Sequence, residues 1–233
     1  MVDFMHKDFY NVGDLVQIVD LLRGPGGCPW DREQTHASIR KDLLEEAYEA
    51  ADAIDTGNLD NLKEELGDVL LQVVFHTSIE RELSGLTLDQ VADGICKKLI
   101  FRHPHVFGCV QVENTAEVLT NWEALKKQEK GQRTRTDVLR AVARALPALW
   151  RAEKVQKKAE KAGLTVGSDV QTRRGILTER VAATENPDDA ERAVGQMLFA
   201  AVSLARAMGV DPEKALTRAT DEFIDTVAQY EGT

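Results

Sequence analysis

Residues 42–68 read DLLEEAYEAADAIDTGNLDNLKEELGD, and this stretch decides the fold. On each side of Gly57 its apolar residues recur every three to four positions, so the stretch predicts two amphipathic helices joined by a short turn. It also carries ten carboxylates and one base, Lys63, so its charge of −9 nearly equals the −10 of the whole chain. Because like charges four residues apart weaken a helix, such clustered acids become favourable when hard cations lie among them.

Helical patterns continue on both sides of this stretch. Apolar spacing and capping signals predict helices over about residues 13–23, 58–84 and 87–103. No strand pattern of comparable strength occurs in the sequence. The expected fold class is therefore all-α.

The two halves of the chain resemble each other. Residues 67–74 read GDVLLQVV and residues 195–202 read GQMLFAAV, which indicates a tandem duplication. The predicted first domain covers residues 1–131, and the predicted second domain covers residues 132–233.

Composition limits the class of protein. The chain is 43% hydrophobic and 29% charged, the usual range of a globular protein, and its pI near 5.1 argues against binding to nucleic-acid polymers or anionic membranes. No apolar run approaches the roughly 18 residues that cross a bilayer, and the first ten residues lack the apolar segment of a secretion signal. With only Cys28, Cys96 and Cys109, no disulfide framework is expected. The expected location is the cytoplasm.

Four carboxylates form the strongest candidate site. Glu46 and Glu49 are three residues apart, and so are Glu65 and Asp68, so each pair projects from one face of its helix. Because the connecting turn is short, the helices should pack antiparallel and bring the two pairs together. Ligation by oxygen alone suits Mg²⁺ or Mn²⁺, which also bind substrate phosphates. The alternative is a solvated helix face without metal, although such faces normally carry compensating bases.

A basic pair follows on the next predicted helix. Lys98 and Arg102 are four residues apart and face the same side. Beside a metal site they would suit a polyphosphate, since arginine binds phosphate oxygens bidentately. Packing of their aliphatic stems and surface ion pairs are the alternative interpretation.

Several motifs now occur in a fixed order. They are CPWDREQTH at residues 28–36, LEEAYE at 44–49, ELGD at 65–68 and RHPHVFG at 102–108. Together they resemble the MazG family of nucleoside triphosphate pyrophosphohydrolases over nearly the whole chain. The resemblance implies an all-α homodimer of tandem four-helix domains that converts an NTP or dNTP to the monophosphate and pyrophosphate.

The resemblance also implies roles for particular residues. It implies Mg²⁺ binding by Glu46, Glu49, Glu65 and Asp68, with Glu45 beside them, and phosphate contacts by Lys98 and Arg102. In the expected reaction, water attacks the α-phosphorus with help from a carboxylate such as Glu45, and which glutamate acts as the base stays open.

Three other features keep two interpretations each. Trp30 either stacks on a nucleobase or pins the Gly/Pro-rich loop to the bundle. His103 and His105 either act at the substrate or complete a turn. A zinc site of these histidines with Cys96 and Cys109 would lack the usual ligand spacing.

The second half departs from the family pattern. By the internal repeat, the glutamates 45, 46 and 49 correspond to Glu179, Arg180 and Ala183, and the acids at 65 and 68 correspond to Ala193 and Gln196. The basic pair corresponds to Glu222 and Thr226. The second domain is therefore expected to be non-catalytic. The alternative function for the whole chain is a non-enzymatic nucleotide-binding or protein-interaction module.

Overall fold

The computed structural model describes residues 4–129, 131, 133–164, 167, 169–185 and 189–231. Every regular element among these residues is a helix, which confirms the all-α prediction. The chain forms two compact units, Met1–Glu113 and Asn114–Thr233. The boundary between these units lies before the duplication boundary that the sequence predicts near residue 131. The duplication concerns the ancestry of the chain and not its packing, so its boundary stays a prediction.

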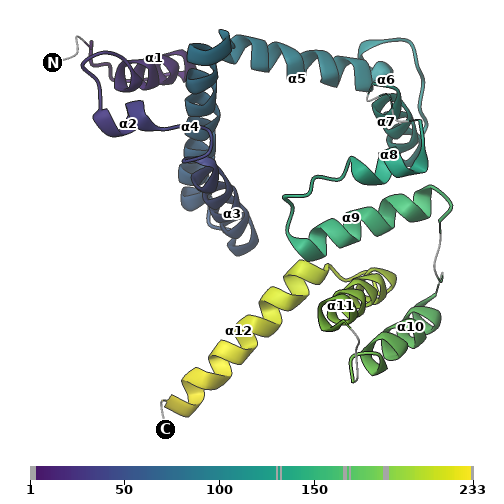
Figure 1. Cartoon of the computed structure of the whole chain (residues 1–233). Helices are drawn as coiled ribbons and strands as arrows, with labels where there is room; N and C mark the ends of the chain where they lie inside the picture. Colours follow the sequence, from purple (N-terminus) through teal and green to yellow (C-terminus); the bar gives the residue numbers. More distant parts are fainter. Residues whose placement is uncertain are drawn as a thin grey trace. The chain divides into compact units, whose positions relative to one another are not determined.

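The described residues of the first unit form six helices (Figure 1). They are α1 (Val12–Arg23), α2 (Pro29–Glu33), α3 (Arg40–Thr56), α4 (Leu59–Ser84), α5 (Leu88–Arg102) and α6 (Pro104–Phe107). Local signals fix the main boundaries: the Asn58 side chain caps α4, and Thr87 with Gln90 forms the expected capping box of α5. Gly57 ends α3 in the left-handed conformation, with φ of 69°, and so turns the chain directly into α4.

The core of the first unit lies around the C-terminal half of α4. Val74, Phe75 and Ile79 of α4 are buried against Val19 of α1 and Ile39, which precedes α3. α3 packs along α4 (Figure 1). The apolar run in the middle of α4 therefore has α1 and α3 as its partners within the chain.

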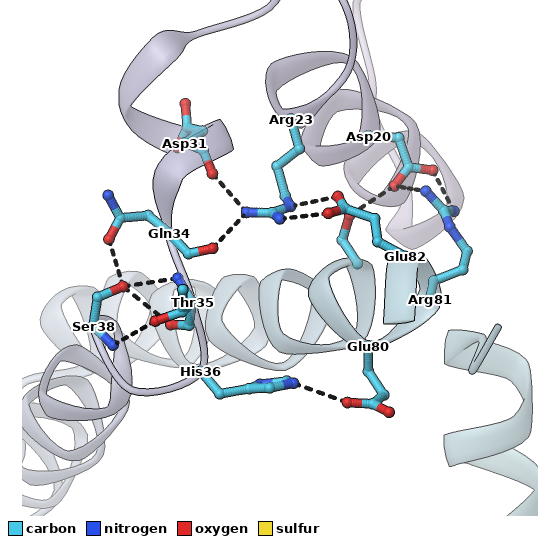
Figure 2. A network of polar contacts seen from close by, with 11 residues as sticks. Asp20, Arg23, Asp31, Gln34, Thr35, His36, Ser38, Glu80, Arg81 and Glu82 are labelled. Carbon is cyan, nitrogen blue, oxygen red and sulfur yellow. Dashed lines mark hydrogen bonds and ion pairs between the residues drawn. The ribbon is translucent and has the colours of Figure 1, made fainter. Parts of the chain in front are cut away.

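A buried arginine attaches the loop after α1 to this core (Figure 2). Arg23, 8% exposed, donates from Nε and Nη2 to the Glu82 carboxylate at 3.0 and 2.9 Å. Its Nη1 donates to the carbonyls of Asp31 at 2.6 Å and Gln34 at 3.3 Å. The same loop needs Gly27, because a Cβ there would lie 2.2 Å from the Leu21 carbonyl oxygen.

In the second unit, the residues that the structure describes form six further helices. They are α7 (Thr115–Glu129), α8 (Arg135–Arg140), α9 (Ala148–Lys161), α10 (Val170–Ala182), α11 (Ala190–Ala207) and α12 (Pro212–Glu231). α11 packs against both α10 and α9, so these three helices form the centre of the unit. α12 begins at Pro212, and Asp211 accepts a hydrogen bond from the Glu213 amide at 2.9 Å.

No single helix within the described residues is long and apolar enough to span a membrane. α11 and α12 meet that criterion only as a joined pair that bends by 104°. The cysteines Cys28, Cys96 and Cys109 are free.

Candidate metal centre

The α3–α4 hairpin positions the acidic residues. Glu46 and Glu49 lie on α3, and Glu65 lies on the first half of α4. One carboxylate oxygen from each of the three lies within 4.8 Å of the others. Among the described residues they are the only such group of potential metal ligands, so the residues of the alternative zinc set do not form one.

No basic side chain of the described residues balances the negative charge of this cluster. Glu65 is buried at 8% exposure, Glu46 is half-buried, and Glu49 is exposed. None of these carboxylates pairs with a lysine or arginine of the described part of the chain. Unpaired carboxylates held this close repel one another, and burial reduces the solvation that would offset the repulsion.

The pKa values of Glu46 and Glu65 reflect this burial and repulsion. Burial raises the pKa of Glu46 above its ordinary 4.5, and the charges of Asp68 and Glu49 raise it further. Burial also raises the pKa of Glu65, followed by the charge of Glu49. The effect of Asp68 on both groups places its charge beside the cluster. A divalent cation would offset the mutual repulsion of these carboxylates and favour their ionised form, and oxygen-only donors fit Mg²⁺ or Mn²⁺.

The other predicted site residues lie elsewhere in this unit. Glu45 is exposed on α3 next to Glu46 and contributes a smaller share of its raised pKa. Lys98 and Arg102 lie near the end of α5, which runs away from the α3–α4 hairpin after Leu88 (Figure 1). Within one chain, the structure therefore does not bring the basic pair to the acidic cluster, and their joint role stays a prediction.

The aromatic and histidine candidates show the following contacts. Trp30 is 59% exposed on α2, whose main contacts are with α1. His103 donates from Nδ1 to the Leu99 carbonyl at 2.6 Å and lies with its ring centre 5.6 Å from that of His105. The His103 contact favours the turn interpretation, while the stacking role of Trp30 stays untested.

A polar stripe on α4 was missed by sequence reasoning. Gln72, His76 and Glu80 follow Asp68 at four-residue intervals and so continue its face of the helix. His36 joins this stripe from the segment before α3, with its Nδ1 2.8 Å from His76 Nδ1. Its Nε2 lies 3.0 Å from Glu80 (Figure 2). The four-residue spacing of the α4 residues was visible in the sequence. Nothing in the sequence indicated that His36 would contact them.

Two atoms of the stripe are buried without a hydrogen-bond partner. They are Oε1 of Gln72 and Nε2 of His76. Burial and the neighbouring His36 lower the pKa of His76, which favours its neutral form. An unsatisfied buried polar atom costs about 1–3 kcal/mol, so these atoms are suited to a ligand group that supplies the missing bonds.

Comparison with known proteins agrees with this arrangement. The model of the MazG nucleotide pyrophosphohydrolase domain matches residues 34–107, all within the first unit. The chain is 40% identical over 224 residues to the Thermotoga maritima nucleoside triphosphate pyrophosphohydrolase/pyrophosphatase MazG, covering 94% of this chain and 84% of the relative.

Two further relatives carry the name nucleoside triphosphate pyrophosphohydrolase. The Escherichia coli K12 protein is 40% identical over 217 residues, covering 90% of this chain and 82% of the relative. The Mycobacterium tuberculosis protein is 44% identical over 153 residues, covering 65% and 45%. Similarity of this extent confirms the resemblance seen in the motifs, and the chain belongs to the MazG family of nucleotide pyrophosphohydrolases.

Proposed function

We propose that this protein is a divalent-metal-dependent pyrophosphohydrolase that converts nucleoside triphosphates to monophosphates and pyrophosphate. The convergence of Glu46, Glu49 and Glu65 without a compensating base carries the proposal. The names of the T. maritima and E. coli relatives support the same substrate class. The first unit contains the catalytic site, because the second unit lacks the corresponding acids.

The residues of the cluster have different proposed roles. Glu46, Glu49 and Glu65, with Asp68 beside them, would hold Mg²⁺ or Mn²⁺. When bound there, the cation would supply positive charge to the phosphate oxygens and favour ionisation of water. A carboxylate next to the ligands, such as Glu45, accepts the proton as the water oxygen bonds to the α-phosphorus. The bond from this phosphorus to the bridging oxygen breaks, and pyrophosphate leaves with that oxygen.

Product analysis tests the reaction. Each NTP and dNTP is incubated with the full chain and Mg²⁺, and the products are resolved by anion-exchange chromatography. We expect the monophosphate and pyrophosphate as the first products. Orthophosphate with the diphosphate as first products, or no turnover of any nucleotide, would contradict the proposal.

A pair of neighbouring residues tests the metal site itself. Glu65→Gln removes a buried member of the cluster, whereas Glu64→Gln removes an exposed carboxylate that lies outside it. Titration calorimetry with Mn²⁺ should show binding to the unaltered chain and to Glu64→Gln, with a large loss for Glu65→Gln. Equal binding to both variants would reject the proposed ligand set.

We also propose a homodimer formed through α5. Val91, Ile95 and Leu99 are 38%, 41% and 47% exposed and lie on one face of that helix. Lys98 shares this face by helical spacing and is half-buried, so a second copy that covers the face would also meet this cation. Arg102 is buried within its own chain at 7% exposure, so Lys98 is the cation that the partner is proposed to supply.

Light scattering tests this assembly. Leu99→Glu places a charge on the apolar face of α5 and should convert dimer to monomer. Lys97→Glu, on another side of the same helix, should leave the dimer intact. A monomer of the unaltered chain at micromolar concentration would refute the proposal without affecting the assignment of the acidic cluster.

A further inference from the structure

The second unit contains a large pocket with the opposite charge. α9, α10 and α11 enclose a cavity of about 580 Å³, within the usual range for small-molecule sites. Four guanidinium groups and a single carboxylate, that of Glu160, line it. The arginines are Arg173, Arg180, Arg192 and Arg206.

Two of these arginines have a structural role. Arg173 is 6% exposed and bonds the carbonyls of Gly167 at 3.1 Å and Ser203 at 2.9 Å, while its Nη2 pairs with Glu160. Arg206 pairs with the other oxygen of Glu160 at 2.6 Å. One carboxylate thus serves two guanidinium groups, so this wall of the pocket keeps a positive charge.

Neither of the other two arginines pairs with an acidic side chain of the described residues. Arg180 donates to the neutral Oε1 of Gln196 at 3.0 Å. Arg192 also lines the pocket, and no carboxylate of the described residues pairs with either side chain. Both side chains are exposed and can reach an incoming anion, for which the planar guanidinium offers two parallel donors.

The rest of the lining is apolar. Ile176 of α10, Phe199 of α11 and Leu164 after α9 border the same cavity. A small inorganic anion would leave this surface uncovered, whereas a nucleotide presents both a charged tail and a flat, largely apolar base. The aromatic ring of Phe199 and the guanidinium planes both provide stacking surfaces for a base.

From this combination we propose that the pocket binds a nucleotide directly through its phosphates, without a divalent cation. Arg180 and Arg192 contact the phosphates, and Phe199 with Ile176 contacts the base. The inference is independent of the activity proposed for the first unit.

Calorimetry of the full chain in EDTA tests the inference, because removal of divalent cations eliminates metal-dependent binding at the acidic cluster. Each of the four ribonucleoside triphosphates, pyrophosphate and adenosine is titrated separately. We expect at least one triphosphate to bind at least tenfold more tightly than pyrophosphate or adenosine. Pyrophosphate as tight as every triphosphate would overturn the nucleotide assignment, and so would adenosine as tight as ATP.

Matched arginine variants locate the binding. Arg180→Gln/Arg192→Gln should weaken triphosphate binding at least tenfold, while Arg174→Gln, an exposed arginine of α10 outside the pocket, should leave it unchanged. Circular dichroism checks that each variant keeps its helices. Undiminished binding by the folded double variant, or no nucleotide binding by the unaltered chain, would overturn the proposal. Neither result bears on turnover with Mg²⁺.

Discussion

The α3–α4 and α10–α11 helix pairs have similar packing but opposite polar faces. Each pair provides the closest association of helices in its unit, and residues 67–74 of α4 resemble residues 195–202 of α11. Glu46, Glu49 and Glu65 converge in the first pair, whereas Arg180 and Arg192 border a cavity in the second. The difference indicates that two helices can keep packing as a pair while their polar positions change to another chemistry.

Loss of catalysis is the largest difference expected between the two pairs. Glu49→Ala or Asp68→Ala should lower kcat/KM by about 1,000-fold, because each removes charge that positions the cation at the phosphates. Arg180→Gln in the second unit should change it by less than about twofold. Steady-state assays of pyrophosphate release measure both effects, with circular dichroism as the check on folding. Retained activity in both first-unit variants would refute the comparison.

The ion-pair networks of the two units should differ next most strongly. Glu160→Gln removes the negative charge that Arg173 and Arg206 share. It should therefore lower the free energy of unfolding by about 3 kcal/mol. Glu82→Gln should cost only about 1 kcal/mol, because that carboxylate is 52% exposed beside Arg23. Urea denaturation measures both, followed by the fluorescence of Trp122 and Trp150 in the second unit and of Trp30 in the first. Equal costs would show that burial of the arginines does not distinguish the networks.

The dependence of stability on pH should have opposite sign in the two units. Because folding raises the pKa of Glu65, its favourable contribution is complete below about pH 4.5 and is lost as pH rises through the raised value. The Arg206 and Arg173 hydrogen bonds lower the pKa of Glu160, so its contribution is present above about pH 4.5 and is lost as pH falls through the lowered value.

Thermal unfolding in EDTA between pH 3 and 8 separates these contributions. Relative to the unaltered chain, Glu65→Gln should gain stability as pH rises, and Glu160→Gln should lose it. Added Mg²⁺ should reduce the difference for Glu65→Gln, because the cation favours the ionised carboxylate. Parallel curves for both variants would contradict the assigned pKa directions.

The smallest effects concern two glycines in corresponding helices. Gly67 of α4 and Gly195 of α11 are helical, and a Cβ at either meets no atom within 4 Å. Alanine at each should add roughly 0.5–1 kcal/mol of stability by lowering the entropy of the unfolded chain. Gly57→Ala is the control and should cost about 1 kcal/mol, because φ is 69° there. Chemical denaturation would reveal a hidden contact if Gly67→Ala were destabilising.

Much of the candidate site followed from local pattern. The three-residue spacing of Glu46 with Glu49 and the short turn at Gly57 were enough to predict that acids from two helices meet. Lys98 and Arg102 show the limit of this reasoning. Their spacing predicted a shared face of a helix, yet spacing contains no information on whether α5 folds back or runs away from the hairpin.

The sequence by itself determined the helices, their caps, the acidic pairs and the family, because each depends on residues within a few turns of one another or on motifs in order. Only the tertiary structure decided that His36 meets His76 and Glu80, that Gln72 keeps an unpaired oxygen, and that arginines of α10 and α11 share one cavity. Those contacts join side chains from different elements. They depend on how whole helices pack, which periodicity along the chain does not specify.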